Sequence, residues 1–108
     1  MNPWLILSLA ILLEVCGTVC LKLSHGMTRP LPVVGVVIFY LSTFTLMSLC
    51  LKNLEIGTVY AVWSGAGTAL VAIIGILYFA ESFNWIKILG LSLVIVGVIL
   101  LHFHQPPS

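Results

Sequence analysis

The chain has 108 residues, of which 61% are hydrophobic and only 6% are charged. A soluble domain of this size cannot bury that much apolar surface, so the composition indicates an integral membrane protein and excludes a soluble enzyme. The net charge of +1 excludes a polybasic protein that binds nucleic acid. The N-terminus lacks a basic segment and a small-residue cleavage site, so we expect the first apolar run to be retained.

Four apolar runs, each close to the roughly 20 residues that a spanning helix needs, occupy most of the chain. We predict transmembrane helices over residues 4–23, 33–51, 58–79 and 85–103, in one all-α domain that covers residues 1–108. The loops are short, so consecutive helices are expected to be antiparallel neighbours. Pro30 and Pro32 predict a turn before the second helix, because proline resists continuing a helix.

Glu14 is the only ionisable side chain well inside an apolar run. A charge at the bilayer centre costs roughly 2.5–3.5 kcal/mol on insertion scales, so such residues mark ion or substrate pathways. The core of the runs contains no lysine or arginine that would neutralise Glu14. Desolvation favours the neutral carboxyl group, which can hold a proton or release it for a cation.

Small and polar residues lie on the same face of the first helix as Glu14. Ala10 and Gly17 stand one turn on either side, and Thr18 follows at i+4, within hydrogen-bonding reach. The small side chains predict space beside the carboxyl group for a bulky ligand. Close helix packing explains them about equally well.

Aromatic residues on the next two helices favour a site for an organic cation. Tyr40 and Thr43 share a face of the second helix, and the buried Tyr40 hydroxyl predicts a hydrogen bond to Glu14. Tyr60 and Trp63 stand at i and i+3 on the third helix, and their ring faces attract cations. An interfacial aromatic belt is the alternative for Tyr60, whereas Trp63 lies deeper.

Two glycine pairs have separate interpretations. Gly65 and Gly67 are expected to interrupt the third helix and form a hinge for alternating access, with close packing as a nearly equal alternative. Gly90 and Gly97 on the fourth helix predict a helix–helix dimer interface.

The sequence predicts no metal or cofactor site. Cys16 and Cys20 lie one turn apart, but no histidine shares their face at ligand spacing, so we expect them to be packing residues. The chain has no phosphate-binding loop and no nucleophile–base motif, so we expect no enzymatic activity.

The loop charges show a small asymmetry between the two membrane sides. Lys22, Arg29 and Lys87 fall near one side and Lys52 near the other, and so small a bias permits insertion in both orientations. Four short helices leave little room for a water-accessible pathway around their one acidic site. We therefore expect an oligomer, for which an antiparallel homodimer is physically possible.

Taken together, these residues resemble the small multidrug resistance family of proton-coupled exporters over the whole chain. The resemblance rests on the size, the four spans and three segments, which are Glu14-Val15-Cys16-Gly17-Thr18, residues 22–29 and residues 60–67. It implies an antiparallel homodimer whose fourth helices pack through Gly90 and Gly97. It also implies that Glu14 is the shared proton and substrate carboxylate and that the pocket is lined by Ala10, Thr18, Tyr40, Tyr60 and Trp63.

The resemblance is greatest to the quaternary-ammonium-compound branch. A second branch, which exports guanidinium compounds, typically has tryptophan at position 17 and lacks a tyrosine at position 40. Gly17 and Tyr40 therefore favour the multidrug branch. Thr43 replaces the serine usual in both branches, which can shift the polar contacts around the carboxyl group.

The resulting hypothesis is a multi-pass protein of the bacterial inner membrane that exchanges protons for hydrophobic organic cations. Its expected partners are protons, small organic cations, membrane lipid and a second copy of the chain. Two alternatives stay open. One is guanidinium export, and the other is a non-transporting subunit that assembles with a larger membrane partner.

Overall fold

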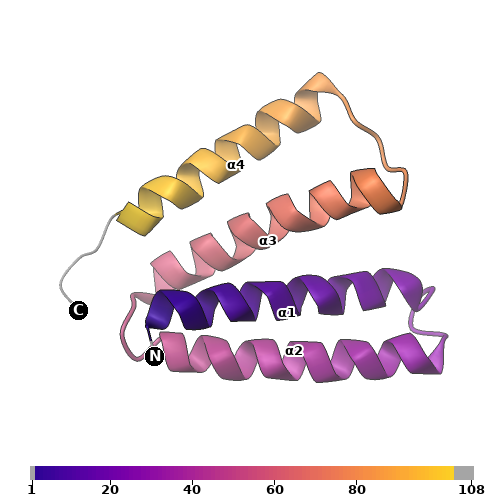
Figure 1. Cartoon of the computed structure of the whole chain (residues 1–108), viewed down its shortest axis with the longest axis horizontal. Helices are drawn as coiled ribbons and strands as arrows, with labels where there is room; N and C mark the ends of the chain where they lie inside the picture. Colours follow the sequence, from indigo (N-terminus) through magenta and orange to yellow (C-terminus); the bar gives the residue numbers. More distant parts are fainter. Residues whose placement is uncertain (1, 104–108) are drawn as a thin grey trace.

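The computed structural model describes residues 2–103 and consists of four α-helices. They are α1 (Pro3–Leu23), α2 (Pro30–Cys50), α3 (Ile56–Tyr78) and α4 (Trp85–Phe103). Each helix is long and apolar enough to cross a membrane, since 19–23 residues at 1.5 Å per residue span about 30 Å. Short connections run between consecutive helices, which alternate in direction (Figure 1).

The helices are not packed equally closely. α1 lies between α2 and α3 and packs along most of α2, whereas α4 packs on α3 and diverges from it toward the α3–α4 loop (Figure 1). The core is shared by the first three helices and contains Leu7, Ala10, Ile11, Val15, Met47, Cys50, Val59 and Val62. α4 contributes no buried residue.

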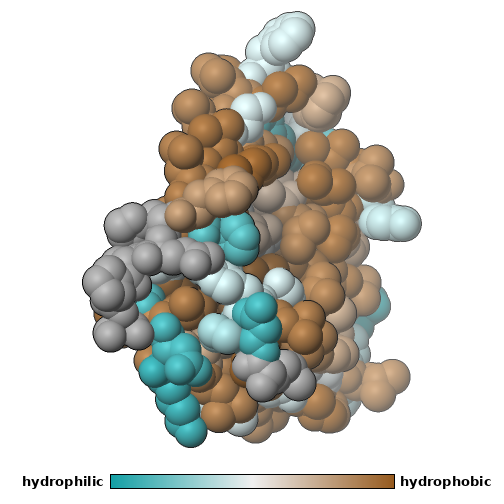
Figure 2. Space-filling model, turned by 60° about the vertical axis from the view of Figure 1, so that its left-hand side comes forward, coloured by the Kyte–Doolittle hydropathy of each residue, from teal (hydrophilic) through white to brown (hydrophobic). Residues whose placement is uncertain are grey.

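The outer surface is apolar. Large hydrophobic side chains are exposed on all four helices, and brown apolar residues cover most of the face in Figure 2. Lipid solvates such surface at no hydrophobic cost, whereas water does not. On α4 the exposure reaches 83% for Trp85 and Ile86, so this helix is left to contact lipid or another protein chain.

The helix ends follow local chemistry. Asn2 caps α1 by accepting a hydrogen bond of 2.8 Å from the Trp4 backbone N–H. α2 begins at Pro30, three residues before the predicted start. Pro30 and Pro32 therefore lie in the first helical turn, which proline tolerates because the N–H groups there have no intrahelical acceptor. Gly26, which follows α1, is left-handed with φ +76°.

Gly65 and Gly67 lie inside an unbroken α3, where the sequence predicted an interruption. A Cβ atom at Gly65 would lie 2.6 Å from Val98 Cγ2 of α4, and one at Gly67 would lie 2.9 Å from Glu14 Oε2. The two glycines therefore let α3 approach its neighbours, as in the packing alternative. Their role as a hinge stays a prediction.

Candidate functional site

Glu14 lies in the middle of α1 and is half-buried. Its Oε1 accepts a hydrogen bond of 2.7 Å from Thr18 Oγ1. The spacing of four residues places the two side chains one turn apart on the same face of the helix. The carboxyl group thus accepts a hydrogen bond from its own helix.

Tyr40 reaches Glu14 through Thr18. The Tyr40 hydroxyl lies 2.9 Å from Thr18 Oγ1. Thr18 has a single hydroxyl hydrogen, which it donates to Glu14, so Tyr40 donates to Thr18. The sequence prediction of a direct Tyr40–Glu14 hydrogen bond was wrong, because Thr18 stands between the two side chains. The result is a chain of hydroxyl groups from α2 to the carboxyl group.

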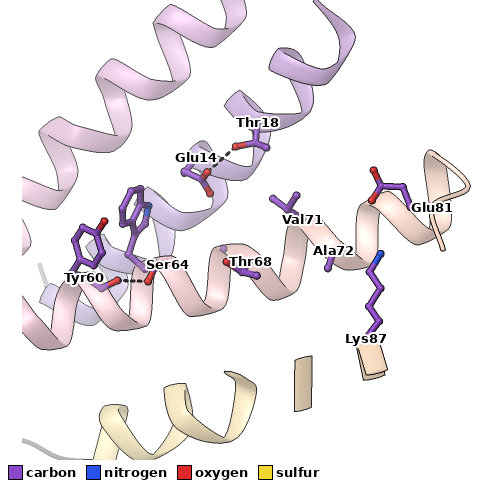
Figure 3. Close-up of a pocket in the computed structure, with 11 residues that line it drawn as sticks. Glu14, Thr18, Tyr60, Ser64, Thr68, Val71, Ala72, Glu81 and Lys87 are labelled. Carbon is purple, nitrogen blue, oxygen red and sulfur yellow. Dashed lines mark hydrogen bonds between the residues drawn. The ribbon is translucent and has the colours of Figure 1, made fainter. Parts of the chain in front are cut away.

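Glu14 lines a cavity of about 550 Å³ between α1, α3 and the start of α4. Figure 3 shows its labelled residues along α3 from Tyr60 to Ala72, with Glu14 and Thr18 facing them from α1. Among the residues predicted for the site, four line this cavity together with Gly67: Glu14, Thr18, Tyr60 and Trp63.

Tyr60 and Trp63 form an aromatic pair at the cavity. Their ring centroids are 5.6 Å apart at an interplanar angle of 74°, and Phe44 of α2 extends the pair at 6.1 Å from Trp63. Trp63 is half-buried, whereas 61% of Tyr60 is exposed. A carboxyl group beside aromatic rings suits a hydrophobic organic cation. The carboxylate attracts the positive charge, and the faces of the rings attract it as well.

Ala10, Gly17, Tyr40 and Thr43 do not line the cavity. Ala10 and Thr43 are fully buried where α1 meets α2, and Thr43 Oγ1 donates to the backbone carbonyls of Phe39 at 2.8 Å and Ala10 at 3.3 Å. The space predicted beside Glu14 at Ala10 and Gly17 is filled by α2, so these small residues serve close packing.

Sequence reasoning missed six residues that line the cavity: Ser64, Thr68, Val71, Ala72, Glu81 and Lys87. Ser64, Thr68 and Val71 follow Tyr60 along α3 at steps of three or four residues, and Ala72 lies four residues after Thr68. Extending the helical face of Tyr60 would therefore have found all four. Glu81 and Lys87 come from the α3–α4 loop and the start of α4. No local pattern links them to Glu14.

The remaining predicted positions, Gly90 and Gly97 on α4, have no neighbouring side chain beside them among the described residues. A Cβ atom at Gly90 or Gly97 would meet no atom within 4 Å, which leaves this stripe of α4 without a neighbour within the described chain. Over residues 2–103 no group of three or more His, Cys, Asp or Glu side chains is close enough to hold a metal ion.

Comparison with known proteins identifies the family of this chain. The model of the family described as "Small Multidrug Resistance protein" matches residues 2–94. The chain belongs to the small multidrug resistance family. It is 47% identical over 102 residues to the multidrug resistance protein EbrB of Bacillus subtilis, with 94% of this chain and 87% of that protein covered.

Two further relatives cover nearly the full length. The chain is 37% identical to the multidrug transporter EmrE of Escherichia coli and 39% identical to the quaternary ammonium compound-resistance protein QacF of Klebsiella aerogenes. Each match covers 94% of this chain and 93% of the relative. With four membrane-spanning helices, this member of the small multidrug resistance family is a multi-pass protein of the bacterial inner membrane.

Proposed function

We propose that this chain exports hydrophobic organic cations in exchange for protons. The observation that carries the proposal is the position of Glu14. Within residues 2–103 it is the one acidic side chain inside a helix, since Glu55 and Glu81 lie outside the helices. It lines a cavity together with Tyr60 and Trp63. The printed names of EbrB, EmrE and QacF support multidrug and quaternary ammonium substrates.

The chemistry follows from competition at a single carboxyl group. The protonated group is neutral and attracts a cation weakly, whereas the ionised group is stabilised by a cation in the low dielectric of the cavity. A cation therefore binds as the proton leaves, and a proton displaces the cation on the opposite side. A cavity of about 550 Å³ lies within the range of sites for drug-sized ligands.

We further propose that two copies of the chain form an antiparallel homodimer. The single chain leaves Tyr60 largely exposed at the edge of its cavity, and α4 buries none of its residues. A second copy would cover both surfaces. Packing of the two α4 helices through Gly90 and Gly97 requires close backbone approach, which glycine permits in lipid.

Tetraphenylphosphonium binding by the purified chain across pH tests the function. Binding is expected to strengthen as pH rises, because protons then compete less for Glu14. Glu14→Gln is expected to remove binding at every pH. Glu55→Gln is the matched control, because Glu55 is exposed at the opposite end of α3 from Glu81 and does not line the cavity. Normal pH-dependent binding by Glu14→Gln would refute the proposal.

The same preparation separates the two alternatives. Binding of guanidinium without binding of tetraphenylphosphonium would indicate the guanidinium branch. If the pure chain binds neither compound and co-purifies with a larger membrane protein, the accessory-subunit hypothesis is favoured. Trp63→Ala is expected to weaken the binding of aromatic cations more than the binding of aliphatic ones, because it removes a ring of the cavity wall.

A further inference from the structure

A second cavity, of about 430 Å³, lies between α1, α3 and α4 and shares no lining residue with the cavity that holds Glu14. It is lined by Trp4 from the first turn of α1 and by His102 from the last turn of α4. Figure 1 shows these two helix ends at the same end of the molecule as the α2–α3 loop. Ile11 also lines the cavity, and its position eight residues after Pro3 corresponds to about 12 Å along the helix axis. The cavity therefore extends from the helix ends toward the middle of the bundle.

The polar groups of this cavity stand at its outer end. His102 is exposed, and its ring meets the ring of Trp4 edge to face, with the centroids 4.5 Å apart and an interplanar angle of 74°. Tryptophan is enriched at the level of the lipid headgroups, because its ring has an apolar body and a polar edge. An imidazole ring carries at least one N–H donor in either protonation state. The outer end therefore offers a hydrogen-bond donor at the depth of the headgroups.

The rest of the wall is apolar. Leu7 and Val62 line the cavity from the core that the first three helices share, and Val98 lines it from α4. Among the described lining residues Ser8 is the one with a hydroxyl group, and its Oγ donates to the Trp4 carbonyl of its own helix at 2.9 Å. None of these lining residues is acidic, so a cation here would lack a counter-charge. The interior suits an alkyl chain.

The cavity faces away from the glycine stripe of α4 that we assign to the dimer. At 100° per residue, Ile99 lies about 200° and His102 about 140° around the helix from Gly97. Ile99 remains 49% exposed in the single chain. A second copy packed on Gly90 and Gly97 would leave this face, and with it the cavity, open to the bilayer. The occupant that the bilayer supplies is a lipid.

We propose that this cavity is a binding site for a membrane phospholipid. One acyl chain lies along Leu7, Val62 and Val98, and the phosphate accepts a hydrogen bond from the His102 ring beside Trp4. The lipid fills space between α4 and the other helices, which matters because α4 buries none of its own residues. The site is separate from the proposed exchange at Glu14, since it has no acidic group and shares no lining residue with that cavity.

The headgroup contact is tested with two lipids that have the same acyl chains. Dioleoylphosphatidylglycerol has a phosphate, and dioleoylglycerol lacks it. Native mass spectrometry of the purified full-length chain measures the affinity for each. His102→Phe keeps an aromatic ring beside Trp4 but removes the N–H donor. It is expected to lower the affinity for the phospholipid by about threefold to tenfold and to leave that for dioleoylglycerol unchanged.

Lys52→Gln is the control for general attraction between the protein and a charged headgroup. Lys52 belongs to the α2–α3 loop at the same end of the molecule, as Figure 1 shows for that loop, and it does not line the cavity. We expect this variant to keep the wild-type affinity for both lipids. An equal loss of phospholipid affinity in His102→Phe and Lys52→Gln would overturn the headgroup contact.

The acyl-chain contact is tested by filling the cavity. Ser8→Phe places a ring on the cavity wall and is expected to lower the affinity for both lipids on the order of tenfold. Ser92→Phe is the matched control. Both serines are exposed and donate to the carbonyl four residues earlier, at 2.9 Å for Ser8 and 2.8 Å for Ser92, but Ser92 does not line the cavity. Equal lipid affinities in the two variants would overturn the proposal.

A second copy of the chain is the competing occupant of the cavity. Analytical ultracentrifugation of the same two serine variants distinguishes it from lipid. If lipid occupies the cavity, Ser8→Phe leaves the oligomeric state as it is in Ser92→Phe. A shift toward monomer in Ser8→Phe alone would assign the cavity to the dimer interface and overturn the lipid site. Tetraphenylphosphonium binding to Glu14 is measured separately, so failure of the lipid site leaves the proposed function standing.

Discussion

The ring of Tyr40 on α2 fills the space beside Gly17 on α1 that a larger side chain at position 17 would need. A Cβ atom at Gly17 would lie 2.6 Å from Tyr40 Cε1 and 3.2 Å from Phe39 Cβ. The missing side chain on α1 is therefore what admits the tyrosine ring, and with it the hydroxyl that reaches Thr18. The two residues that favoured the multidrug branch in the sequence are thus a single packing arrangement.

Gly17→Ala is expected to destabilise the chain by about 1–3 kcal/mol, the usual cost of overpacking a well-filled interface. Adding Tyr40→Ala should recover part of that loss, because the two side chains would no longer compete for the same volume. Unfolding in detergent measures the single and double variants. Strictly additive effects would contradict direct contact between the two positions.

Thr18→Val tests the hydroxyl chain between Tyr40 and Glu14. The variant keeps the shape of the side chain but removes the hydroxyl that donates to the Glu14 carboxylate. That hydrogen bond stabilises the charged form of the carboxyl group. The midpoint of pH-dependent tetraphenylphosphonium binding is expected to move upward by about half a pH unit to one unit. Thr45→Val is the control, because Thr45 donates only to the Leu41 carbonyl of its own helix. A midpoint that falls or stays constant would show that Thr18 does not support the ionised carboxylate.

Gly67→Ala places a methyl group against the Glu14 carboxylate, with its Cβ only 2.9 Å from Oε2. Glu14 has to move, so tetraphenylphosphonium affinity is expected to fall on the order of tenfold. The fold should survive, because the obstructing atom is the end of a flexible side chain. Gly57→Ala controls for alanine in α3, since no atom lies within 4 Å of its added Cβ. Equal affinities in the two variants would argue against contact between Gly67 and Glu14.

Gly97→Leu tests the proposed dimer. The space around Gly97 is open in the single chain, so the substitution should leave helix content unchanged. It should shift the protein toward monomer in detergent, because it blocks close approach of two α4 helices. Ser92→Leu is the matched control, since Ser92 is exposed on α4 and lies about 200° around the helix from Gly90, at 100° per residue. Analytical ultracentrifugation reads the outcome, and an intact dimer in Gly97→Leu would place the interface elsewhere.

Local sequence pattern was sufficient for part of the site. The contact between Glu14 and Thr18 and the pairing of Tyr60 with Trp63 each lie within one helical turn, so the helix repeat alone predicts them. The apolar runs likewise predicted four spans, because chain length and hydropathy set where a helix can cross a bilayer. The start of α2 differed from prediction, since proline is excluded from a helix interior but not from its first turn.

The sequence by itself determined the membrane class, the four helices and the single acidic group at their centre. Only the tertiary structure decided that Tyr40 contacts Thr18 instead of Glu14, that Gly17 admits a tyrosine ring, and that Glu81 shares a cavity with Glu14. The physical reason is that these helices are apolar on every side, so no amphipathic stripe shows which face meets which neighbour. The rotation of each helix and the path of the α3–α4 loop are set by packing between residues far apart in the chain.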